Sequence, residues 1–173
     1  MGKYEISTAV VQDIDVLCDI FLNHIIAHTE YISHGEMQMG VGQAELINGE
    51  IATSVAPEAR VIWLKYIQMH FTDTENGVVY KAVSDDGEIL GFCVADVFRD
   101  GESPFGMVSD LLVREGCRGD GVGSALLEKA LEWLRSKEVA GIYLESGLKN
   151  HEAHEYFMRR GFCKVSEIYK LMK

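Results

Sequence analysis

The stretch from Ser109 to Leu127 constrains the fold of this chain more than any other part of the sequence. It begins with the apolar run Leu111-Leu112-Val113, which is typical of a buried strand. Four glycines follow: Gly116, Gly119, Gly121 and Gly123. Apolar residues then recur with helical spacing at Leu126, Ala130, Trp133 and Leu134. The stretch therefore predicts a strand, a glycine loop and a helix, and the first free N–H groups of that helix would form an anion site.

Two common phosphate-binding loops do not fit this stretch. A P-loop needs G-x-x-x-x-G-K-[ST], and no Gly-Lys-Ser or Gly-Lys-Thr follows the glycines. A dinucleotide fingerprint needs G-x-G-x-x-G, and the last spacing of Gly119-x-Gly121-x-Gly123 is wrong for it. The pattern that fits is R-x-x-G-x-G, from Arg118 to Gly123. An ordinary glycine-rich turn between a strand and a helix would also contain these six residues.

A second segment helps to decide whether the glycine pattern is a binding loop or an ordinary turn. Residues 150–162 match N-x-x-A-x-x-[LF]-Y-x-x-x-G-F at Asn150, Ala153, Gly161 and Phe162. One helix and one strand separate this segment from the glycine loop. Together the two motifs, in this order between about Val108 and Phe162, resemble the GNAT superfamily of GCN-five-related N-acetyltransferases. The N-terminal third carries no motif, only a compatible order of elements.

The resemblance implies a fold, a cosubstrate and a set of binding residues. The fold is α/β (α+β), a mixed and mostly antiparallel sheet of six to seven strands with helices on both faces, in one domain spanning residues 1–173. The cosubstrate is acetyl-CoA, whose pyrophosphate the loop amides would hold. The cofactor-binding candidates are Leu111, Leu112, Val113, Arg118, Gly119, Asp120, Gly121, Val122, Gly123, Ser124, Asn150 and Phe157.

The family reaction moves an acetyl group directly from the thioester to an amine, without a covalent enzyme intermediate. The amine must lose a proton, which a carboxylate can accept. The sequence offers Asp110, just before the loop, and Glu145, at the end of the next predicted strand. Asp110 could equally be a capping or solvent-facing carboxylate, and for Glu145 a structural role is favoured. A backbone N–H near Leu112 would stabilise the carbonyl oxygen.

The general acid is where this chain departs from the family. The family tyrosine falls seven residues after the asparagine, and that position is Phe157 here, with Tyr156 one residue earlier. One residue rotates a helical side chain by about 100°, so Tyr156 is an acid candidate but no simple substitute. Either another group protonates the thiolate, or it leaves unprotonated, or the protein binds acetyl-CoA without efficient turnover.

Composition excludes some classes of function. The formal net charge of −11 argues against a nucleic-acid partner and favours a cationic substrate. No apolar run is long enough to cross a membrane. Four scattered cysteines indicate free thiols and a cytoplasmic location. His24 and His28 are four residues apart, but without an H-E-x-x-H pattern no metal is expected. The resemblance leaves open a homodimer, which is common in the family.

The other elements follow from periodicity. Strands are expected at Tyr4-Glu5-Ile6-Ser7, 78–83, 89–95, 105–113, 142–145 and 164–171, with a turn at Asp85-Asp86-Gly87. A helix from about 12 to 28 would bury Ile14, Leu17, Ile20, Phe21 and Ile25. A helix from 59 to about 71 would turn Val61, Ile62, Leu64, Ile67 and Phe71 inward. Residues 30–56 are irregular and form either a substrate lid or a packed helical excursion.

Three functions are compatible with these observations. The leading hypothesis is an N-acetyltransferase that acts on a primary amine, small and cationic, such as an aminoglycoside, a polyamine or an amino-acid derivative. The second is an acetyl-CoA sensor with little turnover, which the phenylalanine at position 157 favours. The third is acetylation of a protein N-terminus or lysine, because nothing in the sequence marks the acceptor groove.

Overall fold

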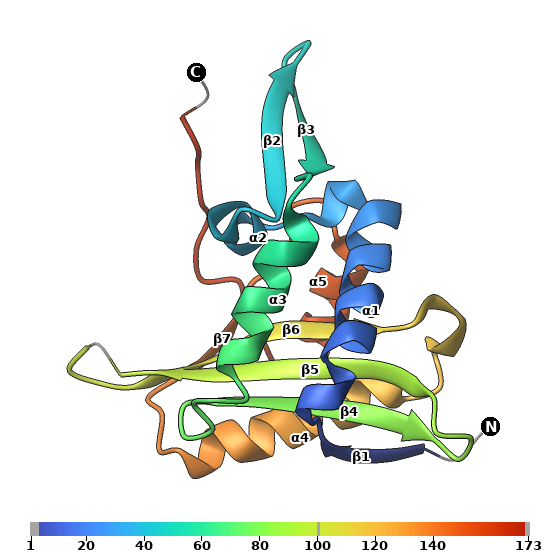
Figure 1. Ribbon diagram of the computed structural model, residues 1–173. Helices are drawn as coiled ribbons and strands as arrows, with labels where there is room; N and C mark the ends of the chain where they lie inside the picture. Colours follow the sequence, from blue (N-terminus) through green and yellow to red (C-terminus); the bar gives the residue numbers. More distant parts are fainter. Residues whose placement is uncertain (1–3, 100, 172–173) are drawn as a thin grey trace. The chain divides into compact units, whose positions relative to one another are not determined.

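The computed structural model describes residues 4–99 and 101–171 (Figure 1). The chain divides into two compact units. One comprises residues up to His24 together with Trp63–Leu144, and the other comprises Ile25–Ile62 and the residues from Glu145 onward. The expected single domain over residues 1–173 therefore stays a prediction.

The first unit is built on a five-stranded sheet. Its strands are β1 (Tyr4–Thr8), β4 (Gly77–Ser84), β5 (Ile89–Phe98), β6 (Phe105–Val113) and β7 (Ile142–Leu144). Their order across the sheet is β1-β4-β5-β6-β7, and every neighbouring pair is antiparallel except β6 and β7. The predicted turn between β4 and β5 is confirmed, since Gly87 has a φ of +83° that glycine adopts without strain.

Helices cover both faces of this sheet (Figure 1). On one face lies α4 (Val122–Ser136), and a Cβ on Gly106 of β6 would come within 2.9 Å of its Leu134. On the other face lie the parts of α1 (Ile14–Ala27) and α3 (Ala59–Met69) that belong to this unit. A short 3-10 turn, η1 (Val11–Asp13), precedes α1. The face predicted for the first helix is confirmed as buried: Ile14, Leu17, Ile20, Phe21 and Ile25.

The inward face of α3 differs from the prediction. Trp63 and Ile67 are fully buried, whereas Val61 is 55% exposed. The Trp63 ring stacks on Phe21 with ring centres 4.9 Å apart, and it meets Phe92 of β5 edge-on at 5.7 Å. All four residues from 61 to 64 are apolar, so periodicity could not distinguish the helix face that holds the tryptophan from the neighbouring face.

The strand β6 is irregular on both of its edges. Val94 of β5 pairs with Asp110, but the next residue, Ala95, pairs with Val108, so Ser109 is an extra residue in β6. Such a bulge re-aims side chains and is frequent next to active sites. On the other edge, the parallel ladder with β7 ends at Val108 and Leu144, although β6 continues to Val113.

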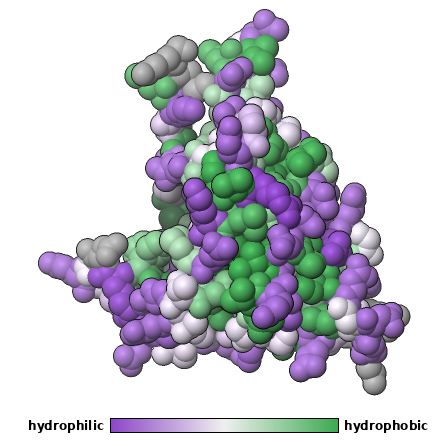
Figure 2. All heavy atoms as spheres, in the orientation of Figure 1, coloured by the Kyte–Doolittle hydropathy of each residue, from purple (hydrophilic) through white to green (hydrophobic). Residues whose placement is uncertain are grey.

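The second unit contains a hairpin that the sequence did not predict. A 3-10 turn, η2 (Thr29–Tyr31), and the helix α2 (His34–Met39) lead into β2 (Gly42–Ile47) and β3 (Glu50–Val55), which form a separate antiparallel two-stranded sheet. The irregular segment predicted for residues 30–56 is therefore largely ordered. Leu46, Ile47 and Ile51 expose apolar side chains on this hairpin (Figure 2). The last helix is α5 (His151–Met158).

The predicted fold class is confirmed as mixed α/β, but the described residues give five strands in the main sheet instead of six or seven. The final predicted strand is wrong within the described residues. Residues 164–171 form no strand, and Val165, Ile168, Tyr169 and Leu171 are each more than half exposed. A strand needs a partner ladder, and the apolar alternation of this segment could not reveal whether one exists.

Candidate active site

The glycine loop joins β6 to α4 as the sequence predicted. A 3-10 turn, η3 (Glu115–Cys117), opens it, and Gly119 and Gly121 have φ values of +90° and +85°. Gly121 is the N-cap of α4 and supplies no side-chain cap. The start of a helix presents backbone N–H groups that no intrahelical carbonyl accepts, so this exposed loop can offer donors to an anionic pyrophosphate.

Two arginines flank this loop. The exposed Arg118 donates from Nη2 to Nδ1 of His24 at 3.0 Å and from Nε to the carbonyl of Val113 at 3.3 Å. Arg114 donates from Nε to the carbonyl of Ile89 at 2.7 Å, so it ties the end of β6 to β5. Arg118 is therefore the better placed of the two for contact with a bound phosphate.

Asp110 lies on β6 directly after the bulged Ser109. Its Oδ2 is shielded from solvent, and the charge of Asp110 acts on the hydroxyl of Tyr66 on α3. Ser109 donates to Oδ2 of Asp96 at 2.5 Å. The bulge thus directs two neighbouring side chains into one polar cluster on the α3 side of the sheet.

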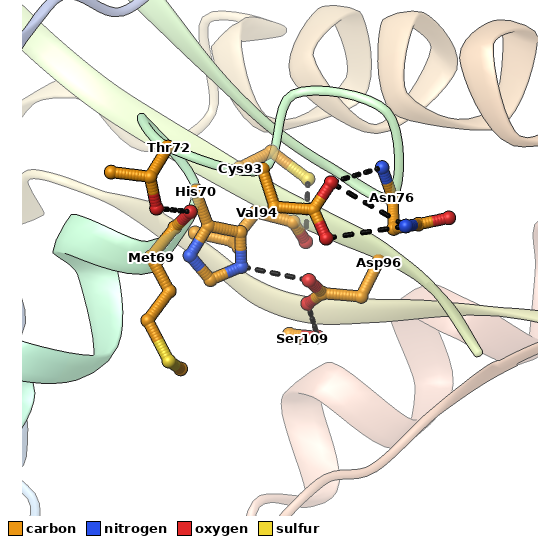
Figure 3. Close-up of polar contacts among 9 residues, drawn as sticks. Met69, His70, Thr72, Asn76, Cys93, Val94, Asp96 and Ser109 are labelled. Carbon is orange, nitrogen blue, oxygen red and sulfur yellow. Dashed lines mark hydrogen bonds and ion pairs between the residues drawn. The ribbon is translucent and has the colours of Figure 1, made fainter. Parts of the chain in front are cut away.

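The cluster continues from Asp96 to His70, which follows α3. Figure 3 shows His70 and Ser109 both directed at the carboxylate of Asp96, and the distance from His70 Nε2 to Oδ1 is 2.8 Å. The side chain of His70 is 4% exposed and that of Asp96 is 18% exposed. The ring of His70 also packs edge-on against Tyr66 at 4.9 Å. His70, Asp96 and Ser109 are therefore joined by hydrogen bonds between α3 and the sheet, with Tyr66 packed beside them.

Burial and nearby charges shift the pKa values of several groups in this cluster. Burial, followed by the charges of Asp110 and Asp96, raises the pKa of the Tyr66 hydroxyl well above its ordinary value. The same causes raise the pKa of the Cys93 thiol. Burial lowers the pKa of His70, but the hydrogen bond and charge of Asp96 outweigh it, and the pKa is raised overall. Tyr66 and Cys93 are thus held neutral, whereas His70 is favoured as a cation.

Glu145, the second base candidate, belongs to the second unit. It accepts a hydrogen bond from the backbone N–H of Gly35 at 2.8 Å, and its Oε2 lies 3.5 Å from Nδ1 of His34. These contacts hold the start of α2. They match the structural role that the sequence favoured for this carboxylate.

The last motif also lies in the second unit. Asn150 caps α5, and its Oδ1 accepts from the N–H of Ala153 at 3.3 Å. The hydroxyl of Tyr156 is buried without a hydrogen-bond partner among the described residues, and the guanidinium of Arg160 lies 4.6 Å from the centre of its ring. Phe157 meets Tyr156 edge-on at 5.2 Å. The predicted contacts of Asn150 and Phe157 with the cofactor stay predictions.

The sequence analysis missed four members of the cluster: Tyr66, His70, Asp96 and Ser109. One signal was present, because Trp63, Ile67 and His70 share one helical face and a histidine on an apolar face needs a partner. The partner, Asp96, follows an apolar strand and shows no motif. The bulge that positions Ser109 leaves no mark in the sequence.

A family model described as "Acetyltransferase (GNAT) family" matches residues 48–162, which include the bulged strand, the glycine loop and α5. The chain belongs to the GNAT acetyltransferase family. It is an acetyl-CoA-dependent N-acetyltransferase, as the resemblance implied. Among the described residues, no group of three or more His, Cys, Asp or Glu side chains could hold a metal ion, and no helix is long and apolar enough to cross a membrane.

Individual GNAT proteins resemble parts or all of this chain. N-alpha-acetyltransferase 30 from Schizosaccharomyces pombe is 26% identical over 109 residues, which cover 61% of this chain and 71% of that protein. A putative acetyl transferase from Pyrococcus furiosus has a TM-score of 0.67 at 19% identity, covering 98% of this chain and 99% of that one. AAC(6')-Iy, solved with the bisubstrate analogue CoA-S-monomethyl-acetylneamine, has a TM-score of 0.66 at 14% identity and covers 99% of both chains.

Replacing Gly121 with valine should weaken coenzyme A binding by about 10- to 100-fold, comparable to losing one charge-assisted hydrogen bond. The φ of +85° strains a β-branched residue, and the side chain would occupy the approach to the amides. Isothermal titration with coenzyme A measures the effect. Gly116→Val is the matched control, because a Cβ at Gly116 meets nothing within 4 Å. If the two variants bind coenzyme A with equal affinity, Gly121 is not part of the coenzyme A-binding loop.

Arg118→Ala should weaken coenzyme A by about 10-fold, because one charge-assisted contact to a phosphate is lost. Pantetheine, which carries no phosphate, should bind the variant and the wild type equally. Titration of both ligands measures the difference. Arg114→Ala is the control, since Arg114 is engaged with the carbonyl of Ile89. If the variant loses affinity equally for coenzyme A and for pantetheine, Arg118 does not contact the phosphates.

The contribution of His70 to stability should depend on pH. Four groups face its imidazole: Asp96, Asp110, Tyr66 and Asp73. Because the folded-state pKa is raised above 6.5, the stabilisation is complete below that pH and is lost as pH rises through the raised pKa. The free energy of unfolding of the wild type minus that of His70→Gln should therefore fall between pH 6 and pH 9. Urea unfolding measures it, and a difference that grows with pH would contradict the assigned sign.

Proposed function

We propose that this protein transfers the acetyl group of acetyl-CoA directly to a small, cationic primary amine, with Asp110 as the general base. The observation that carries the proposal is the position of Asp110, on β6 just before the glycine loop, with its Oδ2 shielded from solvent. A carboxylate at that place can accept the amine proton within the same unit that offers the loop amides.

In the proposed reaction, the neutral amine attacks the thioester carbonyl, so that the C–N bond forms and the C–S bond breaks. Asp110 accepts the proton that the nitrogen loses, and the thiolate of coenzyme A leaves. A backbone N–H of β6 near Leu112 stabilises the carbonyl oxygen, because β6 extends beyond its ladder with β7. Positioning of the two substrates supplies much of the rate.

The charge of the chain supports a cationic acceptor. The formal net charge is −11, and Asp96 and Asp110 both act on Tyr66 from the same side of the sheet. A protonated amine would be attracted to such a surface. Location in the cytoplasm and assembly as a homodimer stay part of the proposal.

Two observations favour other functions. The relative from Schizosaccharomyces pombe is called an N-alpha-acetyltransferase, which favours a protein N-terminus, or by extension a lysine, as the acceptor. Phe157 at the family tyrosine position favours an acetyl-CoA sensor with little turnover.

A screen for coenzyme A release with acetyl-CoA separates these functions. The acceptors should include aminoglycosides, polyamines, amino-acid amides, peptides with free N-termini and N-acetylated peptides that contain lysine. Turnover that is highest with a small cation supports the proposal, whereas a preference for peptides supports the second candidate. No release with any acceptor, together with measurable binding of acetyl-CoA, would identify a sensor.

A further inference from the structure

The carboxylate of Asp96 is held by hydrogen bonds on both of its oxygens (Figure 3). Nε2 of His70 lies 2.8 Å from Oδ1, and the hydroxyl of Ser109 donates to Oδ2 at 2.5 Å. The side chains of His70 and Asp96 are largely buried. Hydrogen bonds to a carboxylate are shorter and stronger than those between neutral groups. Asp96, on β5, therefore fixes the side chain of Ser109, on β6.

Ser109 is also the residue that makes β6 irregular. Val94 of β5 pairs with Asp110. The next residue of β5, Ala95, pairs with Val108, so Ser109 is left without a partner in the ladder. Such an extra residue bends its strand and increases the local twist. Its side-chain hydrogen bond to β5 holds it where a ladder pair would otherwise do so.

The bulge decides the face of the sheet to which Asp110 points. Side chains alternate along a strand, so Val94 and Asp96 of β5 share one face. Asp110 stands opposite Val94 and points to that face. Ser109 reaches Asp96 there, so two consecutive residues of β6 share the face. If β6 ran without the bulge, Asp110 would stand opposite Cys93 and would point to the other face.

We propose that Asp96 is a positioning residue for the acetyl transfer, which holds Ser109 in the bulge and thereby aims the carboxylate of Asp110 at the amine. The proposal rests on the proposed function, in which Asp110 is the base. His70 supports Asp96 at its other oxygen and is a second positioning residue. All three act through Asp110. A reacting group misplaced by about 1 Å can lower the rate by about 100-fold, so a fixed bulge matters to the reaction.

Removal of one hydroxyl tests this role with the smallest change. Ser109→Ala should lower kcat with the best amine from the screen by about 10- to 100-fold, because the base is misplaced. The KM for acetyl-CoA should keep its wild-type value, since the loop amides lie on other residues. Ser109→Thr retains the hydroxyl and should restore most of kcat. Ser136→Ala is the control and should keep the wild-type rate, because this hydroxyl donates to the carbonyl of Trp133 at the end of α4.

A double-mutant cycle shows whether the effect passes through the base. It compares kcat of Asp96→Ala, of Asp110→Asn and of the variant that carries both changes. If Asp96 acts by aiming the carboxylate of Asp110, its removal costs nothing further once that carboxylate is gone. The combined variant should therefore be as slow as Asp110→Asn alone. Losses that multiply would overturn the proposal, because they would show that Asp96 acts independently of the base.

Crystal structures of the wild type and of Ser109→Ala give a readout that needs no turnover. The Asp110 carboxylate should move by about 1 Å or more when the hydroxyl is lost. An Asp110 that keeps its place, or a Ser109→Ala variant with unchanged kcat, would overturn the proposal. If the wild type acetylates no amine, or if Asp110→Asn leaves kcat unchanged, the proposed function fails. The crystal structures alone then decide whether Asp96 and Ser109 position Asp110.

Discussion

Asp110→Asn should lower kcat by about 100- to 10,000-fold at neutral pH, the range typical of a missing general base. The amide of asparagine is similar in shape to the carboxylate and can still accept a hydrogen bond, so the fold of the bulged strand should persist. It cannot accept the amine proton at neutral pH. The affinity for acetyl-CoA should change little, because the loop amides lie on separate residues.

The measurement is kcat against the best amine of the screen, with coenzyme A affinity measured in parallel. Glu145→Gln is the matched control, because the amide oxygen can still accept from Gly35, and it should affect kcat by less than about 10-fold. If Glu145→Gln strongly lowers kcat and Asp110→Asn leaves it unchanged, Glu145 is the base and Asp110 has the structural role.

Variants that remove or add a hydroxyl at positions 156 and 157 test which group protonates the leaving thiolate. Tyr156→Phe should be mild, since its hydroxyl is buried and a thiolate is a fairly stable leaving group. Phe157→Tyr restores a hydroxyl at the family position and should raise kcat. A large loss in Tyr156→Phe would make Tyr156 the acid after all, and the missing partner of its buried hydroxyl would then be the thiolate.

The sequence predicts well those elements whose structure depends on residues close together in the chain. The glycines of the loop, the turn at Gly87 and the amphipathic face of α1 each depend on neighbours within about one or two turns of chain. These elements, and the family, could therefore be predicted before the fold was known.

The polar cluster could not be predicted, because its members come from separate elements. Tyr66 lies on α3, and His70 comes directly after that helix. Asp96 lies on β5 and Ser109 lies on β6. Only the pairing of β5 with β6 brings the last two together, and it does so through a one-residue register shift. The hairpin of β2 and β3 was missed for a related reason, since its exposed apolar residues blur the alternation of a half-buried strand.

Trp63→Ala should lower the free energy of unfolding by about 3–5 kcal/mol, the usual cost of truncating a large core aromatic. Trp63 is fully buried, and it joins Phe21 of α1 to Phe92 of β5. Because Tyr66 and His70 continue the same helix toward the site, the variant should also lower kcat.

Urea unfolding with the m-value measured in each variant tests this prediction. Trp63→Phe is the control, because it retains a stacked ring and removes an indole N–H that is buried without a hydrogen-bond partner among the described residues. It should lose clearly less stability than the alanine variant. Val61→Ala changes an exposed residue of the same helix and should stay within about 0.5 kcal/mol of the wild type. If Trp63→Ala is no less stable than Val61→Ala, the tryptophan does not anchor α3 to the sheet.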